Sequence, residues 1–460
     1  MNLLFSRRRF FKAATLGLGG LTLGSVPGPF QRRLLAAAPG GNRRKLLFIF
    51  QSGGNDGINT VIPRGDPDYS TATRPTLFVP EATALDTGNG FAQLHPSLQP
   101  LMEIYNQSGL NGVEGPGNLA LLHRVGYANQ SRSHFDSQQF WQNGVPGDPK
   151  LEEGLFYRHL ARTLDLKDEA NSFVAAALSS SQMVALKGAD PIPNFTASDQ
   201  FNVLGNSVRA AKLLGHLPTN GGGADGEGLL GLYGGAPDRY GRPYRALIHD
   251  TGRLMGATIN TLQAALSQGT YTPENGAVYP TGTFGNRLQE AAMLFKRTPV
   301  RILGLNLGGW DTHSNQGLAN GSQGQLLERL ATGLQALYRD LQSQWEDLLI
   351  VTMTEFGRTS EENGSGGTDH GESSVVFAAG GGVRGGVYNC DPQSWESGAM
   401  FSERDRYLAR RTDFRTVFGE IFTAHFGDDT ALLDAIMPGY SEASAADPAT
   451  FQQLGFLGGA

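Results

Sequence analysis

The chain has 460 residues, of which 39% are hydrophobic and 17% are charged, and it contains 63 glycines. This composition is typical of a loop-rich globular protein and argues against a disordered chain. The formal net charge of −6 gives the chain no overall basic character, so we expect no nucleic-acid partner.

The first 38 residues have the pattern of a targeting segment. The stretch SRRRFFK, which contains Arg7 and Arg8, precedes a short, glycine-rich, weakly apolar run. It resembles the twin-arginine consensus, so we expect residues 1–38 to be a signal peptide and the twin-arginine translocase to be a partner during export. The protein would then be periplasmic or extracellular and would be exported folded. The alternative explanation is a basic N-terminal helix.

Residues 39–460 are expected to form a single domain. No later apolar run approaches the roughly 18 residues that cross a bilayer, so no transmembrane span is expected other than the signal itself if it stays uncleaved. Ala36 and Ala38 fit a cleavage pattern, but Pro39 follows them, and cleavage is therefore left open. Cys390 is the only cysteine, which excludes an internal disulfide.

Five apolar segments, each followed by polar or glycine-rich residues, predict buried strands. These segments are residues 46–51, 119–125, 300–307, 348–354 and 374–379. Leucines at helical spacing in residues 323–345 lie between the third and fourth strands, and such a strand–helix–strand unit predicts a parallel sheet. Further amphipathic helices are predicted in residues 286–296 and 413–427. The fold class is therefore α/β.

The middle of the chain, about residues 145–290, has a different character. Strand patterns are harder to find there, and the stretch TNGGGADGEGLLGLYGGAPD predicts a glycine-rich loop. We expect this part to be a mostly helical insertion or cap on the α/β domain.

Polar side chains follow the predicted strands. In open parallel sheets, ligands collect beyond the carboxyl ends of the strands, so these residues are candidates for one common site. They are Asp56 after the first strand, Ser133 and His134 after the second, Asp311 and His313 after the third, Glu355 and Arg358 after the fourth, and Asp369 and His370 in the loop before the fifth.

Carboxylates and imidazoles that meet at strand ends predict a site for a divalent metal. Asp311 and His313 would share one side of an extended backbone and form a pair of ligands, with Asn315 as a supporting partner. Each residue alone also has a simpler explanation, since Asp-Gly is a common turn and a solitary histidine is usually structural. The sequence does not distinguish Zn²⁺, Mn²⁺, Fe²⁺ or Ca²⁺, or one ion from two.

The stretch SHFDSQQFWQNG predicts a helix with Ser133 as its N-cap and a glycine at its end. A hydroxyl at a helix N-terminus lies where an anion is stabilised, so a phosphate or sulfate ester is a candidate ligand there, with Ser133 as nucleophile. A serine that only caps the helix explains the pattern equally well.

Five motifs in this order carry a family resemblance: GGNDGINTVIP, SRSHFDSQQFWQNG, GGWDTH, TEFGRT and GTDHG. Together with the twin-arginine start, they resemble exported bacterial proteins grouped as domain-of-unknown-function family 1501, over about residues 45–425. That family is similar to the alkaline phosphatase and sulfatase superfamily, an α/β sandwich with two metals over its strand ends. The resemblance implies an alkaline phosphatase-like sandwich with a mostly parallel central sheet flanked by helices.

The resemblance also implies roles for individual residues. Asp56 would bind one metal, Ser133 would be the nucleophile, and the pair Asp311 and His313 would bind the other metal. Two alignments of the last motifs stay open. By its letters, Asp369-His370 resembles the superfamily's Asp-His-Gly ligand motif. By topology, Glu355 takes the place of that motif's aspartate, His370 becomes the final histidine, and Phe356 stands where a ligand histidine is expected.

We therefore expect an exported, metal-dependent hydrolase that acts on a small or polymer-linked phosphate or sulfate ester. The alternative is a non-catalytic exported binding or assembly protein on the same scaffold, which Phe356 favours. A metal-independent serine hydrolase is disfavoured because no G-x-S-x-G motif occurs. The candidate catalytic residues are Ser133, His134 and Arg358, the last to pair with the ester anion, and the candidate metal ligands are Asp56, Asp311, His313, Glu355, Asp369 and His370.

Overall fold

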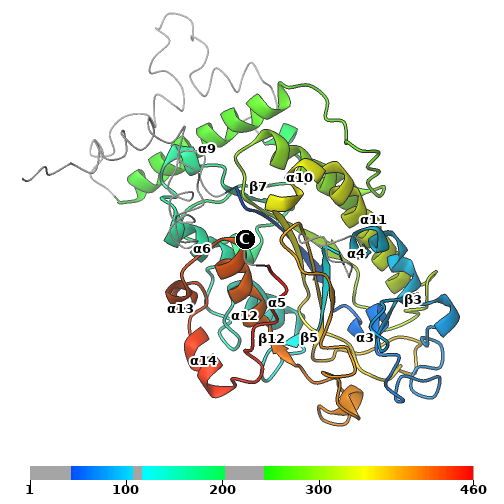
Figure 1. The fold of residues 1–460 in the computed structure, drawn as a ribbon. Coiled ribbons are helices and arrows are strands. Elements are labelled where there is room, and N and C mark those ends of the chain that lie inside the picture. Colours follow the sequence, from blue (N-terminus) through cyan, green and yellow to red (C-terminus); the bar gives the residue numbers. More distant parts are fainter. Residues whose placement is uncertain (1–42, 107–116, 202–242, 459–460) are drawn as a thin grey trace, which may run out of the picture. The chain divides into compact units, whose positions relative to one another are not determined.

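A mostly parallel sheet forms the centre of the fold (Figure 1). The computed structural model describes residues 43–106, 117–201 and 243–458, so the predicted signal peptide lies outside the described residues. Within these ranges nine strands pair in the order β11-β5-β10-β9-β1-β8-β6-β7, with β12 paired to β5, and of these strands β10 alone runs against its neighbours. The strands are β1 (Lys45–Ser52), β5 (Leu119–Gly126), β6 (Ala175–Leu178), β7 (Asn194–Phe195), β8 (Ile302–Gly308), β9 (Leu348–Met353), β10 (Ser374–Ala379), β11 (Gly386–Tyr388) and β12 (Thr412–Asp413).

Strand β1 is buried on both faces of this sheet. Leu47 and Ile49 belong to one hydrophobic core, whereas Leu46, Phe48 and Phe50 belong to the other. A strand covered on both sides needs an apolar residue at nearly every position, which explains the run LLFIF. The strand pairs in parallel with β8 and β9, so its end lies beside theirs.

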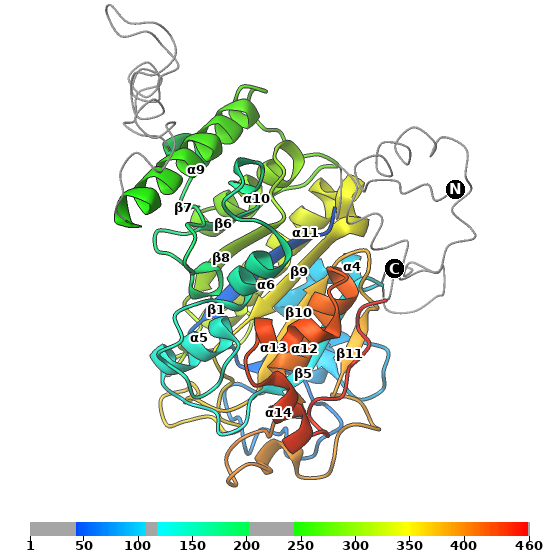
Figure 2. The same ribbon diagram turned by 90° about the vertical axis from the view of Figure 1, so that its left-hand side faces the viewer.

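Helices cover both faces of the sheet (Figure 2). On the face of Leu47 and Ile49 lie α10 (Thr283–Arg297) and α11 (Ser322–Asp340), whose apolar stripes enter that core. On the other face lie α5 (His134–Asn143), α6 (Leu155–Thr163) and α12 (Phe414–Glu420), which a π-helical turn, Ile421–His425, continues. Residues Arg44–Ala460 form one compact unit.

The remaining elements in the described ranges are short, apart from one long helix. A second, three-stranded sheet has the order β2-β4-β3. Among the described residues, no helix combines the length and the apolar character needed to cross a bilayer. The elements are α3 (Gly57–Thr60), β2 (Val61–Ile62), β3 (Leu85–Asp86), β4 (Gln93–Leu94), α4 (Met102–Tyr105), α9 (Pro243–Leu266), α13 (Leu433–Ile436) and α14 (Tyr440–Ala446).

The structure confirms the α/β class and the mostly parallel central sheet flanked by helices. Each of the five predicted strands is present, with bounds that differ from the prediction by at most two residues. Strands β6 and β7 come from the segment that we expected to be mostly helical, and they extend the sheet beyond β8. The sequence of β6 is AAAL, and alanine is a poor strand former, so its pattern gave no strand signal.

Candidate functional site

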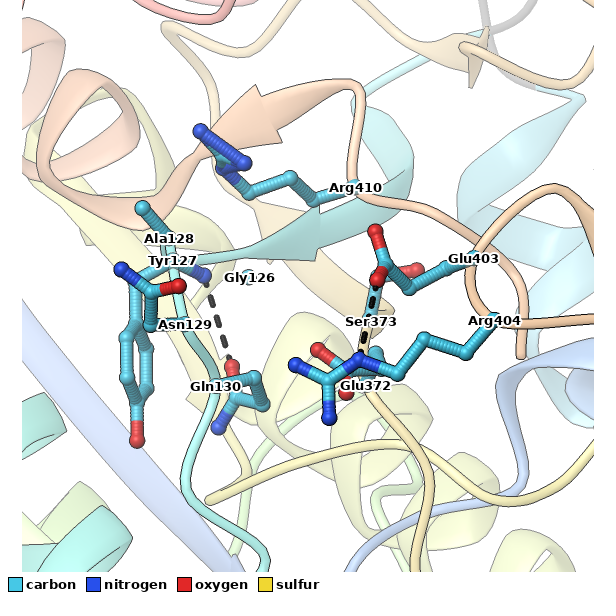
Figure 3. A pocket seen from close by; sticks show the side chains of 10 residues that line it. All are labelled: Gly126, Tyr127, Ala128, Asn129, Gln130, Glu372, Ser373, Glu403, Arg404 and Arg410. Atoms are coloured by element: carbon cyan, nitrogen blue, oxygen red, sulfur yellow. Dashed lines mark hydrogen bonds and ion pairs between the residues drawn. The ribbon is translucent and has the colours of Figure 1, made fainter. Parts of the chain in front are cut away.

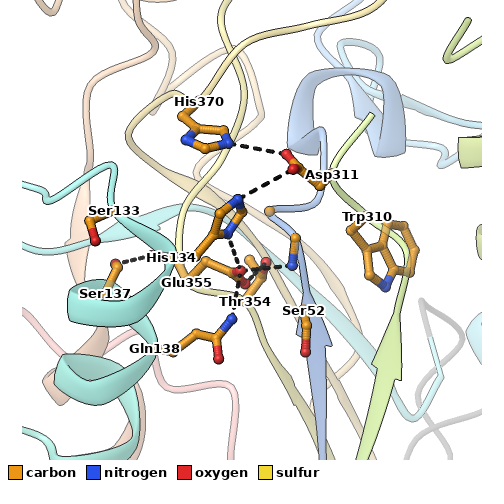
Figure 4. Close-up of polar contacts among 12 residues, drawn as sticks. Ser52, Ser133, His134, Ser137, Gln138, Trp310, Asp311, Thr354, Glu355 and His370 are labelled. Atoms are coloured by element: carbon orange, nitrogen blue, oxygen red, sulfur yellow. Dashed lines mark hydrogen bonds and ion pairs between the residues drawn. The ribbon is translucent and has the colours of Figure 1, made fainter. Parts of the chain in front are cut away.

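Four loops and the first turn of α5 meet at one edge of the sheet (Figure 4). Three of the loops follow β1, β8 and β9, and the fourth precedes β10, whose reversed direction places its start at the same edge. They bring one ligand atom each of His134, Asp311 and His370 within 4.8 Å of one another. His313 joins them, because its Nε2 lies 2.9 Å from Nε2 of His370. We call these four residues the His–Asp cluster.

Two glycines allow the loops to approach this closely. Gly53, which follows β1, has a φ of +124°, and a Cβ there would lie 2.3 Å from the backbone nitrogen of Asp311. At Gly367, a Cβ would lie 2.4 Å from the carbonyl carbon of His313. Neither position has room for a side chain, so these glycines are required for packing around the cluster.

The first turn of α5 places His134. The hydroxyl of Ser133 accepts a hydrogen bond from the backbone N–H of Asp136 at 3.4 Å and caps the helix. Nδ1 of His134 lies 2.8 Å from Oε1 of Glu355, a buried carboxylate that also accepts the N–H of Gly53 at 2.7 Å. Glu355 therefore holds the ring so that its Nε2 lies 3.4 Å from Oδ2 of Asp311.

The other two imidazoles are held in the same way. Nδ1 of His313 lies 3.0 Å from Oδ1 of Asp369, and Nδ1 of His370 lies 2.8 Å from the carbonyl oxygen of Arg132. Carboxylate and carbonyl oxygens only accept hydrogen bonds, so Nδ1 carries the proton in each ring. Nε2 is then left with a lone pair, and this is how metal-binding histidines are usually oriented.

The lone pairs of the three imidazoles point towards Asp311. Oδ1 of Asp311 lies 3.1 Å from Nε2 of His370 and 3.2 Å from Nε2 of His313. Two unprotonated nitrogens at 2.9 Å repel each other, so the arrangement requires a cation between them, either a proton or a metal ion. The donor set suits a divalent metal, and His134, Asp311, His313 and His370 are the residues that would hold it.

Electrostatics favours the metal-binding forms of two members of the cluster, Asp311 and His370. Burial acts to raise the pKa of Asp311, but the hydrogen bond and charge of Arg358, with His370 and His313, outweigh it and lower the pKa to about 2. Burial lowers the pKa of His370, whereas the hydrogen bond to Glu355 raises the pKa of His134. At neutral pH the cluster therefore offers an anionic Asp311 and an unprotonated His370.

Arg358 does not face the cluster as a free cation. Its side chain is fully buried, and its guanidinium donates to the carbonyl oxygens of Gly54 at 2.8 Å, Trp310 at 2.8 Å and Thr368 at 3.1 Å. It also donates to Oδ1 of Asp311 at 2.7 Å. We predicted that Arg358 binds an ester anion, but these bonds use its donors to join the loops that carry the cluster.

Asp56 is also not a metal ligand in this structure. Its carboxylate and the guanidinium of Arg74 are both fully buried and form an ion pair of 2.6 Å. Oδ2 of Asp56 accepts a second bond from Nε2 of Gln316 at 2.7 Å. In this structure Arg74 and Gln316 bind the oxygens that a metal would need, so the geometry does not favour the predicted role.

Three other predicted residues lie close to the cluster in different roles. Glu355 and Asp369, predicted as ligands, bind the Nδ1 atoms of His134 and His313 and orient those rings. Ser133, predicted as nucleophile, caps α5, and among the described residues its hydroxyl makes no hydrogen bond to the cluster (Figure 4).

Sequence reasoning missed two features of this site. His134 was predicted as a catalytic residue and not as a ligand, because the sequence does not show where its Nε2 points. Gln316 was not singled out, yet its buried amide accepts bonds from Thr312 at 2.9 Å and Thr368 at 2.7 Å and donates to Asp56. Its place three residues after His313 was the only available signal.

A comparison with protein families identifies one match. Residues 246–399 match the model of DUF1501, which is described as a protein of unknown function. The resemblance to this family that the sequence motifs indicate is therefore supported over residues 246–399. No curated protein matches the chain.

The segment that matches the DUF1501 model carries most of the cluster. It includes Asp311, His313 and His370, together with the orienting residues Glu355 and Asp369. His134 lies outside the matched segment, so the cluster joins that segment to α5.

A cavity of about 180 Å³ lies at the end of β5 and the start of β10 (Figure 3). Its side chains carry both signs of charge, and one of them, Glu372, forms an ion pair of 2.6 Å with Arg132. Since the carbonyl oxygen of Arg132 binds His370, the cavity wall connects to the cluster through one residue. The lining residues are Gly126, Tyr127, Ala128, Asn129, Gln130, Glu372, Ser373, Glu403, Arg404 and Arg410.

Proposed function

We propose that this protein is an exported, metal-dependent hydrolase of phosphate or sulfate esters. The observation that carries the proposal is the convergence of three imidazole Nε2 atoms and one carboxylate at the strand-end edge. Ligands and substrates of parallel α/β folds gather at this edge. A small or polymer-linked anionic ester would approach the solvent side, where Asp311 and His313 are both nearly half exposed.

A bound divalent metal would act as a Lewis acid and stabilise the negative charge that develops on the transferred group. The residues of the chain would provide its position. Glu355 and Asp369 orient two of the imidazoles, and Arg358 keeps Asp311 anionic and ties its loop to the neighbouring loops. In this scheme the predicted catalytic residues His134 and Arg358 hold and position the metal centre.

The fold also supports a more specific description of the scaffold. We infer an alkaline phosphatase-like sandwich from three features together: the mostly parallel sheet, the helices on both faces, and donor-bearing loops at its carboxyl-end edge. The part of residues 145–290 that does not contribute strands would be the insertion on this scaffold.

Export is the remaining part of the proposal. The motif with Arg7 and Arg8 supports passage through the twin-arginine translocase to the periplasm or the exterior. Transport in the folded state would allow the metal to be bound before export. Fusing residues 1–38 to a reporter that must be exported folded, with a matched Arg7→Lys, Arg8→Lys variant, tests this part. Export that is the same in both fusions would contradict it.

Turnover of a panel of phosphomonoesters, phosphodiesters and sulfate esters tests the catalytic part. The metal-loaded full chain is expected to release phosphate or sulfate from at least one class, and the variants Asp311→Asn and His370→Gln are expected to lose this activity together with their metal. A metal-loaded chain that turns over none of these esters would exclude the hydrolase function.

One set of contacts favours a second candidate, a non-catalytic binding or assembly protein. Phe356 is buried, and its ring lies 4.9 Å from the ring of His134 and 4.5 Å from that of His370. An apolar ring therefore covers one side of the cluster, and Ser133 is used as a helix cap. Stable metal binding without turnover of any ester would support this candidate.

A further inference from the structure

We propose that the His–Asp cluster binds one ion of a first-row transition metal, and that Arg74 prevents a second ion from binding at Asp56. This inference deepens the proposed function and rests on the same site. It specifies the number of ions, their class and the ligands, none of which the sequence determined.

The distances between donor atoms suit a single ion. Two ligands about 2.1 Å from a zinc ion are separated by roughly 3.0 Å at a right angle and roughly 3.4 Å at the tetrahedral angle. The separations in the cluster are 2.9 Å between His313 and His370, 3.1 and 3.2 Å from these histidines to Asp311, and 3.4 Å from His134 to Asp311. Three of these values fall in the range expected for donors around one ion, and the value of 2.9 Å lies just below it.

The donor types select the class of metal. Three imidazoles and one carboxylate are a nitrogen-rich set, whereas Ca²⁺ and Mg²⁺ prefer sites built from oxygen. Zn²⁺, Fe²⁺ and Mn²⁺ accept imidazole readily, and the single cysteine is buried elsewhere in the chain. The cluster therefore fits a transition-metal ion and does not fit Ca²⁺, which the sequence had left open.

The carboxylate that follows β1 is already neutralised. After β1, Asp56 pairs with the buried guanidinium of Arg74 through two bonds, of 2.6 and 3.3 Å. Arg74 is held in place by the carbonyl oxygens of Thr359 and Ser360, both at 2.9 Å. A cation at Asp56 would have to displace a guanidinium with four bonds, so this carboxylate is not available to a metal.

Metal titration of the full chain tests the inference without relying on activity. Protein stripped with a chelator is titrated with Zn²⁺ against a chromophoric competitor, and Co²⁺ is used to report coordination by its absorption spectrum. We expect one Zn²⁺ per chain and binding of Ca²⁺ that is weaker by many fold. His134→Gln, His313→Gln, His370→Gln and Asp311→Asn are each expected to weaken Zn²⁺ binding by more than about 100-fold, beyond the loss typical of an orienting residue.

The exposed Asp405, on a neighbouring turn, provides the matched control for Asp311. Asp405→Asn should bind Zn²⁺ as the wild type does, and thermal unfolding verifies that each variant is folded. Two tightly bound ions per wild-type chain, or Ca²⁺ bound as tightly as Zn²⁺, would overturn the inference. If one ion binds through these four residues and no ester is hydrolysed, the inference stands and the proposed hydrolase function fails.

Discussion

A single carboxylate, Glu355, illustrates how this site is organised at the scale of residues. It follows β9, where a ligand was expected, but its oxygens bind the N–H of Gly53 and Nδ1 of His134. A buried anion behind an imidazole fixes the ring and makes Nε2 more basic. The carboxylate would therefore act on a bound metal through His134.

Replacing Glu355 with glutamine should therefore weaken metal binding without abolishing it. The neutral amide keeps the shape of the side chain but removes the charge that polarises His134. We expect Zn²⁺ affinity to fall by about 10–100-fold in Glu355→Gln, as measured by competition with a chromophoric chelator. The exposed Glu361 provides the control, Glu361→Gln. Equal affinity in Glu355→Gln and wild type would show that the hydrogen bond does not orient His134.

The buried ion pair of Asp56 and Arg74 leads to a prediction about stability. Arg74→Met would leave the Asp56 carboxylate buried without its cation. Removing one partner of a buried pair costs about 3–5 kcal/mol, so the free energy of unfolding should fall by this amount. Denaturant unfolding measures the change. The double variant Asp56→Asn, Arg74→Met should recover part of the loss, and a double variant no more stable than the single one would contradict this explanation.

At the scale of elements, helix α5 connects the cluster to the sheet. Its first residue is the ligand His134, and buried Phe140 and Trp141 farther along pack into the core beneath the sheet. The position of the ligand therefore depends on where the helix begins. Ser133 sets that start by capping the helix.

Ser133→Ala should destabilise the protein and leave its metal content intact. Loss of an N-cap costs about 1 kcal/mol, which denaturant unfolding can detect, whereas elemental analysis should still find the wild-type amount of metal. Ser133→Asp keeps a capping oxygen and should restore stability. If Ser133 were the nucleophile, ester turnover would be lost in both variants while the stability of Ser133→Asp matched that of the wild type.

The tight turn at residues 403–407 is the second informative element. Arg404 and Asp405 both have positive φ, of +55° and +51°, and the turn is closed by two backbone hydrogen bonds between Glu403 and Tyr407. It carries Arg406, whose guanidinium lies 3.1 Å from Asp369, the partner of His313. Arginine and aspartate adopt this conformation less readily than glycine and asparagine do.

Replacing these two residues with Asn-Gly should therefore stabilise the chain. The double variant Arg404→Asn, Asp405→Gly matches the sequence that such turns prefer, and we expect a gain of about 1 kcal/mol in the free energy of unfolding. Thermal and denaturant unfolding measure it. Replacing Glu361, an exposed residue outside the turn, should leave the free energy of unfolding unchanged. A double variant that is less stable than the wild type would show that other contacts hold the turn.

At the scale of the whole molecule, the sequence predicted the strands well and the contacts of the loops poorly. Long apolar runs such as β1 must be buried on both faces, so their pattern is unambiguous. The alanine-rich β6 has no such pattern and becomes a strand because β8 offers it an edge. For the site, the sequence predicted the donor-bearing loops, but the pairing of Asp56 with Arg74 is a long-range contact that depends on the folded chain.

The last prediction concerns how the stability of the whole chain depends on pH. His123 and His425 are buried, and burial lowers the pKa of each to about 3. In the unfolded chain their pKa is about 6.5, so below that pH the unfolded state takes up protons that the folded state does not.

The free energy of unfolding should therefore fall as the pH decreases from about 6.5, by roughly 1.4 kcal/mol per pH unit for each of these histidines. Carboxylates with a lowered pKa, such as Asp311, add to this loss only below about pH 4, where they begin to be protonated in the unfolded chain. His134 has a raised pKa, so its contribution is fully present below about pH 6.5 and does not change in this window. Urea unfolding between about pH 6.5 and pH 4.5 measures this slope. His95, whose pKa burial lowers to about 4, adds to it, and Glu372 and Glu420, whose pKa values burial raises, oppose it. His425→Gln should reduce the slope by the share of one histidine, since a neutral amide can donate to the Lys45 carbonyl that Nε2 of His425 contacts at 3.0 Å. A slope that is the same in wild type and variant would mean that His425 is protonated in the folded chain, despite the positive charges of Arg44 and Arg301 beside it.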